Sequence, residues 1–379
     1  MPDYPETVYW LTLINESGLK LSQVKPIVQR WGVLEQRSLA ELFDLTPLDW
    51  STTFGLAEAE AKQVQRIRAK LEPQAKALAQ WQSQGLEALL RIDSRYPRRL
   101  AETLPLVQQP LILWGQGGLD LLNEPGVAML GGPAPDAAAG QLIEELMQAL
   151  VDEEINLISG YGRGLDRSTS EPMLTTPGGH AIAILPMGLA AFAKTTTKLS
   201  QAVETGQIAL VSPFMPDTPY QDKLAEARNL LIDHLALVLL MLEPDEDSTG
   251  RGAAALNRGV PVLMGGDADR ATDYHRALLN LGALLLTDAG EVIEVVQQAI
   301  IDATLQEPLV EAAPAPVARP THPNQDDDFS LHTDTVAPID SQEALEILSL
   351  GGEIPEVLRQ RLQKPQSQDP DLNKPSSAK

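Results

Sequence analysis

Glycine residues follow three short apolar segments, at Gly131 and Gly132, from Gly160 to Gly164, and at Gly188. A glycine has no Cβ atom, so its backbone N–H can approach an anion closely. If the apolar segments are parallel β-strands, these glycines meet at the carboxyl edge of the sheet, where doubly wound sheets bind their ligands. The pattern predicts a site for a phosphate or a nucleotide backbone. The alternative is a set of turn glycines without a ligand.

The middle segment, SGYGRGLDRSTS over residues 159–170, carries the most polar groups. It adds the hydroxyl of Ser159, the guanidinium of Arg163 and the carboxylate of Asp166 to its three glycines. We expect Asp166 to be the N-cap of a helix whose dipole favours an anion. The G-x-G-x-G spacing differs from the G-x-G-x-x-G of dinucleotide-binding folds, so we expect neither NAD nor FAD, nor any other cofactor.

A second polar pair, Arg228 and Asn229, lies in the segment EARNLLID, directly before a long apolar run. An arginine can form two parallel bonds to a phosphate, and an asparagine can bind a base or a backbone group. The alternative is an internal salt bridge from Arg228 to Glu226 or Asp222. The predicted site comprises Gly131, Gly132, Ser159, Gly160, Arg163, Gly164, Asp166, Gly188, Arg228 and Asn229, with no metal ligand and no catalytic residue.

The composition excludes several classes of protein. The chain has no cysteine, which excludes a disulfide framework, a thiolate zinc site, an iron–sulfur cluster and a cysteine nucleophile. Its five histidines are widely spaced and form no H-E-x-x-H pair, so we expect no metal site. No apolar run is long enough to cross a membrane, and the N-terminus does not resemble a signal peptide. We therefore expect a cytoplasmic protein.

The charge is unevenly distributed along the chain. Residues 1–104 are neutral overall, whereas residues 105–303 hold 10 basic and 26 acidic side chains, a net charge of −16. A surface with this charge repels a phosphate backbone. Any binding of nucleic acid must therefore depend on a local cluster of basic groups.

The pattern of apolar residues predicts an α/β protein with several parts. Residues 1–84 have helical spacing and many strong helix formers, which predicts a small all-helical domain. Gly18, in the turn-like segment SGLK, is a weak indication of a SAM or helix–hairpin–helix domain, and plain helical packing is the alternative. Residues 304–340 predict a flexible linker, and residues 341–379 predict a short helical, largely disordered tail; together these acidic parts carry a net charge of −7.

Between these parts, residues 85–303 alternate between strand and helix patterns, which predicts a doubly wound parallel sheet. The segments LEALLRID, YPRRL and LILWG at its start predict short extended pieces. The unbroken apolar run 235–242 predicts a strand in the sheet interior, and 283–286 predicts an edge strand. The other predicted strands are 126–132, 155–160, 181–188, 208–213 and 260–266.

The order of the segments SG-x-G-x-G-x-D, A-I-L-x-x-G, A-R-N and S-x-G resembles that of the DNA-processing (DprA/Smf) family. A YP-x-x-L segment at Tyr96 adds to the resemblance, which covers residues 8–300. The resemblance implies a helical N-terminal domain, an extended Rossmann fold, and binding of single-stranded DNA. It also implies loading of a RecA-type recombinase during natural transformation and recombination, by a binding protein rather than an enzyme. A homodimer is a further expectation.

The sequence departs from the motifs of that family at several positions. Gly131, Gly132 and Pro133 stand where the family has Gly-Ser-Arg, and only the Arg-Asn core of Phe-Pro-x-Arg-Asn-Arg is kept. A lost arginine removes a phosphate contact, and a proline lacks a backbone donor. Thr169 and Ser170 stand for Ala-His, and Ser248, Thr249 and Gly250 stand for Ser-Gly-Ser. The cations left to contact phosphates are Arg163, Arg167 and Arg228, with Lys194 and Lys198.

Two other functions stay open. One is that of a divergent paralogue that has lost its DNA site and binds a small phosphorylated ligand or a protein partner. The other is that of a nucleotide hydrolase of the lysine-decarboxylase-like group, which would need a P-G-G-x-G-T-x-x-E segment. TTPGGHAIA supplies Pro177, Gly178 and Gly179, but His180 and Ala181 follow and no glutamate is present.

Overall fold

The computed structural model describes residues 4–131, 137–162, 164–195, 198–265, 272–286 and 288–306. Two predicted site residues, Gly132 and Arg163, lie outside these ranges. The predicted tail of residues 341–379 and nearly all of the predicted linker also lie outside them.

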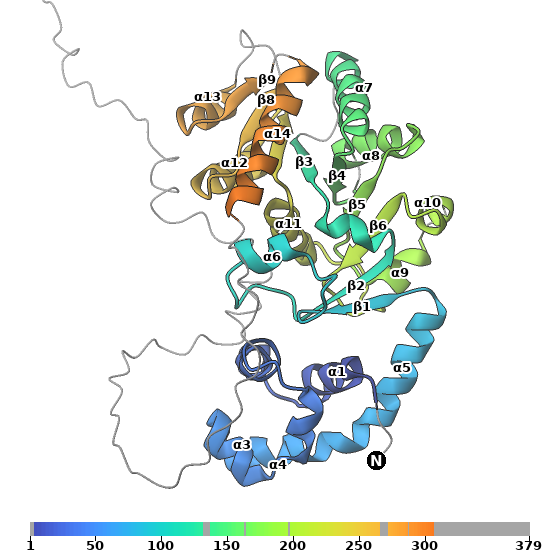
Figure 1. Cartoon of the computed structure of the whole chain (residues 1–379), viewed down its shortest axis with the longest axis vertical. Coiled ribbons are helices and arrows are strands. Elements are labelled where there is room, and N and C mark those ends of the chain that lie inside the picture. Colours follow the sequence, from blue (N-terminus) through green and yellow to red (C-terminus); the bar gives the residue numbers. More distant parts are fainter. Residues whose placement is uncertain are drawn as a thin grey trace, which may run out of the picture.

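Residues 6–83 form a compact group of helices below the sheet (Figure 1). Their apolar faces bury the indoles of Trp10 and Trp50. Local signals set several helix ends: a capping box from Thr46 to Asp49 begins α3, and Gly55 ends it with a φ of +68°. The elements are α1 (Glu6–Glu16), α2 (Leu21–Val28), η1 (Gln29–Leu34), η2 (Leu39–Asp44), α3 (Pro47–Phe54), α4 (Glu58–Arg66), η3 (Ile67–Lys70) and α5 (Leu71–Ser83).

A nine-stranded sheet follows, in the order β1-β2-β6-β5-β4-β3-β7-β8-β9. The strands from β6 to β9 in this order are parallel, whereas β2 is antiparallel to β6 and to β1. This confirms the predicted α/β class and its mostly parallel sheet. The strands are β1 (Glu87–Leu90), β2 (Ile112–Gly117), β3 (Gly126–Gly131), β4 (Asn156–Ser159), β5 (Ala181–Ile184), β6 (Ile208–Ser212), β7 (Val238–Leu242), β8 (Val262–Gly265) and β9 (Leu284–Leu286).

Strand β7 lies between β3 and β8, and Leu239 and Leu240 have no exposed surface. The prediction of an interior strand is therefore confirmed, as is the edge position of β9. The prediction of an extended piece at YPRRL is wrong, because residues Arg98–Thr103 form the helix α6. Pro97 precedes this helix with a fixed φ of −57°, and Asn123 accepts a hydrogen bond from the N–H of Arg98, so the first turn is well supported.

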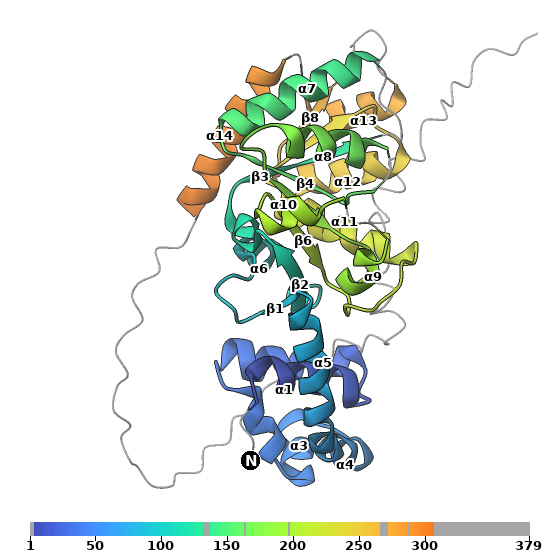
Figure 2. The ribbon, with the colours of Figure 1, turned by 90° about the vertical axis from the view of Figure 1, so that its right-hand side faces the viewer.

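Helices cover both faces of the sheet (Figure 2). One hydrophobic cluster includes side chains of α7 (Ala137–Asp152), α8 (Leu165–Thr175) and α14 (Ala289–Gln306). The other cluster includes side chains of α6, α11 (Lys223–Leu235), α12 (Glu246–Asn257) and α13 (Asp273–Asn280). The remaining elements are η4 (Leu119–Asn123), α9 (Leu189–Ala193) and α10 (Ser200–Glu204).

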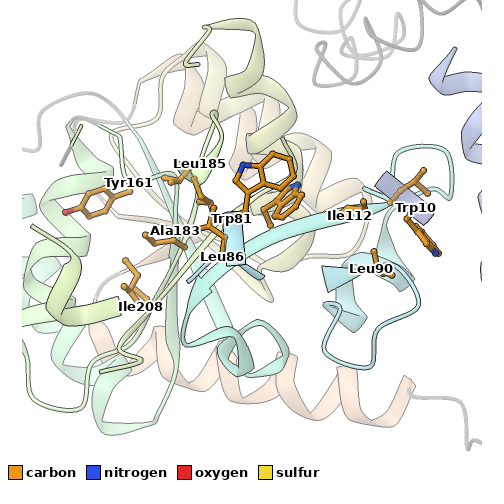
Figure 3. Close-up of a cluster of buried hydrophobic side chains, with 14 of the residues drawn as sticks. Trp10, Trp81, Leu86, Leu90, Ile112, Tyr161, Ala183, Leu185 and Ile208 are labelled. Atoms are coloured by element: carbon orange, nitrogen blue, oxygen red, sulfur yellow. The ribbon is translucent and has the colours of Figure 1, made fainter. Parts of the chain in front are cut away.

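The helical region packs directly on the sheet. The rings of Trp81 on α5 and Trp114 on β2 lie 5.0 Å apart, and the indole N–H of Trp81 donates to Asp217 at 3.0 Å. Figure 3 shows this part of a hydrophobic cluster that runs from the helices onto the sheet. A domain boundary near residue 84 stays a prediction, because the two parts share this core. No helix among the described residues has the length and hydropathy needed to cross a membrane.

Candidate nucleic-acid interface

The loop after β4 meets the helix α11 at the carboxyl edge of the sheet. The guanidinium of Arg228, on α11, lies directly against Gly160, so a Cβ atom at position 160 would fall 1.1 Å from Nη1. Only glycine fits this position without moving the arginine. The structure therefore brings together the two segments that the sequence singled out separately.

Asp166 connects the loop to the arginine. Its Oδ2 accepts the backbone N–H of Gly162 at 3.0 Å and lies 3.5 Å from Nη1 of Arg228. The predicted N-cap role of Asp166 is wrong, because the helix α8 begins at Leu165 and Gly164 is its N-cap, with a φ of +72°. The carboxylate instead reaches back from the first turn. The partner of Arg228 is thus Asp166, and neither Glu226 nor Asp222 forms the expected salt bridge with it.

The hydrogen-bonding capacity of Arg228 is largely unused within the described part of the chain. Its side chain is only 13% exposed, yet its Nε has no hydrogen-bond partner there. Burial lowers its pKa below the ordinary value, although the nearby carboxylate of Asp166 opposes this shift. A guanidinium stays charged even so, and it offers five donors in a planar fork. An anion with several oxygens would satisfy it better than Asp166 does.

A second arginine–aspartate pair lies beside the first. Arg251, on α12, donates to both carboxylate oxygens of Asp233 over 2.6–3.1 Å. Burial lowers the pKa of Arg251, but the charge and hydrogen bonds of Asp233, together with the charges of Asp247 and Asp166, outweigh burial, so the pKa is raised. This pair joins α11 to α12.

The other predicted residues lie around this centre with different roles. Ser159 is buried and its hydroxyl bonds to that of Ser170 at 3.0 Å, so it shapes the loop from inside. At Gly131, a Cβ atom would meet the carbonyl oxygen of Leu242 at 1.8 Å, which explains the glycine by strand packing. Gly188 packs in the same way, against carbonyl groups of the loop after β6. Asn229 is half-buried on α11.

One residue that the sequence analysis missed is Tyr220, which lies in the loop before α11. Tyr220 is 56% exposed, and its interaction with the carboxylate of Asp222 raises the pKa of its phenol. The positive charge of Arg228 opposes this shift. A lone aromatic residue within the polar segment TPYQDK was the available signal in the sequence.

Exposed cations also lie near this edge, on α8 and in the segment after α9. Arg167 is 47% exposed, with its guanidinium 5.5 Å from the ring of Tyr161 and 3.9 Å from Glu171. Lys194 and Lys198 are exposed after α9. No three His, Asp or Glu side chains within the described ranges gather closely enough to hold a metal ion.

The doubly wound sheet, with an arginine and a glycine-rich loop at its carboxyl edge, defines a Rossmann-like protein. The family model for DNA recombination-mediator protein A matches residues 87–297, and the chain belongs to this family. The resemblance found in the sequence is thereby confirmed.

Relatives agree with this assignment. DNA processing protein DprA of Streptococcus pneumoniae is 28% identical over 206 residues, which are 53% of this chain and 71% of that protein. Protein Smf of Synechocystis is 27% identical over 320 residues, which are 76% of this chain and 75% of that protein. The X-ray structure of DprA from Streptococcus pneumoniae has the same fold, with a TM-score of 0.60 and 23% identity, over 76% of this chain and 97% of that one.

Proposed function

We propose that this protein binds single-stranded DNA at the carboxyl edge of its sheet and thereby mediates recombination. The observation that carries the proposal is the guanidinium of Arg228, which is buried against Gly160 and has an unpartnered Nε. A phosphate oxygen bound there would exchange the loose contact with Asp166 for charge-assisted hydrogen bonds.

A strand bound at this point would have further contacts within reach. The exposed ring of Tyr220 suits stacking against a base, which is tolerant of sequence because every base has a flat face. Arg167, Lys194 and Lys198 are exposed near the same edge and suit neighbouring phosphates. Few cations in an acidic domain predict weak binding that is best seen at low salt.

The remaining parts of the proposal rest on the family. In this role the chain is a binding protein and not an enzyme, it needs no cofactor, and it acts in the cytoplasm. It hands the strand to a RecA-type recombinase, and it works as a homodimer. The acidic surface of residues 105–303 favours the second candidate, a site for a small phosphorylated ligand, because such a ligand meets fewer carboxylates than a long strand does.

Fluorescence anisotropy with a labelled oligothymidine at low salt tests the proposal. We expect the wild-type chain to bind and Arg228→Ala to bind at least tenfold more weakly. Lys62→Ala is the matched control, because it removes an exposed cation from the helical region and should leave affinity unchanged. Equal affinity in Arg228→Ala would place the contact surface elsewhere. If no strand binds, and a nucleoside monophosphate binds to the wild-type chain but not to Arg228→Ala, the second candidate is correct.

A further inference from the structure

A cavity of about 620 Å³ lies between the helical region and the sheet, away from Gly160. Its volume is within the range of small-molecule pockets. Helices α1 and α2 form one wall, and β2, the loop after β6 and α11 form the others. Most of its lining is apolar and includes Leu11, Ile14, Trp114, Phe214, Met215 and Leu224.

The charged groups of this cavity are unusual for such an acidic chain. Lys25 and Lys223 are the charged residues among those described as lining it, and no aspartate or glutamate lines it. The whole chain nevertheless has 52 acidic and 29 basic side chains. The cavity is therefore a basic, apolar pocket within an acidic protein.

Lys25 is the key residue of the pocket. It is 6% exposed, and its ammonium donates to the carbonyl oxygen of Val107 at 2.6 Å. No carboxylate pairs with it among the described residues, and burial lowers its pKa to about 8. A buried ammonium without a counter-charge is costly, and its other two N–H groups can still donate hydrogen bonds to an anion.

We propose that this cavity binds a small aliphatic carboxylate, with the carboxylate at Lys25 and the apolar chain along the walls formed by α1 and α11. A peptide segment fits less well, because its backbone N–H and C=O groups would find few polar partners on these walls. A single charged head with an apolar chain leaves no polar group unsatisfied. Each methylene that the cavity buries adds favourable transfer free energy.

Isothermal titration calorimetry of the full chain with decanoate, below its micelle-forming concentration, tests the site. We expect one decanoate per chain. Lys25→Met should weaken decanoate binding at least tenfold and leave the binding of 1-decanol within about twofold, because the alcohol lacks the charge but keeps the chain. Lys76→Met, which removes an exposed charge from α5, should change neither. None of these readouts depends on DNA binding.

Three results would overturn the proposal. The first is that decanoate does not bind. The second is that Lys25→Met binds decanoate as tightly as the wild type, which would show that the ammonium does not recognise the carboxylate. The third is displacement of decanoate by a synthetic peptide of residues 341–363, which would make the cavity a docking site for the chain itself.

Discussion

Helix α11 carries one member of each of two arginine–aspartate pairs. The pairs differ in how many of the arginine's hydrogen-bond donors have a partner. Asp233 accepts three hydrogen bonds from Arg251, with the carboxylate side chain only 8% exposed. Arg228 has a single contact of 3.5 Å to Asp166. A saturated pair fixes two helices together, whereas an unsaturated one has donors for a ligand. This contrast is the reason why we propose that Arg228, and not Arg251, binds a ligand.

The largest expected effect is on the stability of the protein, at the fully hydrogen-bonded pair Arg251–Asp233. Asp233→Ala leaves a buried guanidinium without its partner, and we expect a loss of about 3–5 kcal/mol in the free energy of unfolding. Asp166→Ala breaks one contact of 3.5 Å to a carboxylate that is 24% exposed, and it should cost about 1 kcal/mol or less. Urea unfolding of both variants checks the difference, and equal losses would remove the distinction between the pairs.

Lys25 extends the comparison to a buried cation that has no acidic partner in the described part of the chain. Lys25→Met removes the buried ammonium of Lys25, and burial lowers the pKa of this group from 10.5 to about 8. Below pH 8 we expect the variant to be more stable by about 2 kcal/mol, after allowing for the lost hydrogen bond. In the wild type, the unfolded state binds more protons between pH 8 and 10.5, so wild-type stability rises across that window. The gain of the variant should therefore vanish by about pH 10.5, which urea unfolding as a function of pH would show.

Substitution of Tyr220 tests whether the Arg228–Asp166 pair is part of a nucleic-acid surface. Tyr220→Ala should weaken binding of oligothymidine by about 1–3 kcal/mol, the usual value for one stacked base. Tyr220→Phe keeps the ring and is the matched control, so its affinity should equal that of the wild type. A loss in both variants would instead point to the hydroxyl group.

The smallest expected effect concerns the carboxylate that competes for Arg228. Asp166→Asn removes the negative charge and keeps an oxygen for the N–H of Gly162. We expect oligothymidine to bind up to about fivefold more tightly, which corresponds to about 1 kcal/mol. Glu72→Gln removes one charge from the distant helix α5 and should have no effect. Weaker binding in Asp166→Asn would mean that the carboxylate orients Arg228 and does not compete for it.

The sequence predicted those features that depend on local pattern. Apolar runs such as 235–242 identified interior strands because parallel strands are buried on both faces. Glycines at the ends of three of the strands marked the carboxyl edge, and Arg228 was singled out because it lies next to the apolar run 235–242. The helix at Arg98–Thr103 was missed, because its support comes from Asn123, outside the segment.

Features that depend on contacts between distant segments could not be predicted in the same way. Nothing in the sequence identifies Asp166 as the partner of Arg228, since several acidic residues lie nearer to it along the chain. The cavity at Lys25 is formed by segments from both parts of the chain. Such contacts are set by packing, which no local pattern encodes.

The salt dependence of oligothymidine affinity in the wild type and in Arg228→Ala tests the central claim most directly. Each phosphate neutralised on a single strand contributes about −0.7 to the slope of log affinity against log salt. With about three contacts, wild-type affinity should fall about twentyfold over a fourfold rise in salt. The account predicts that Arg228→Ala binds more weakly and with a slope shallower by about 0.7. An unchanged slope would contradict it, because Arg228 would then contact no phosphate.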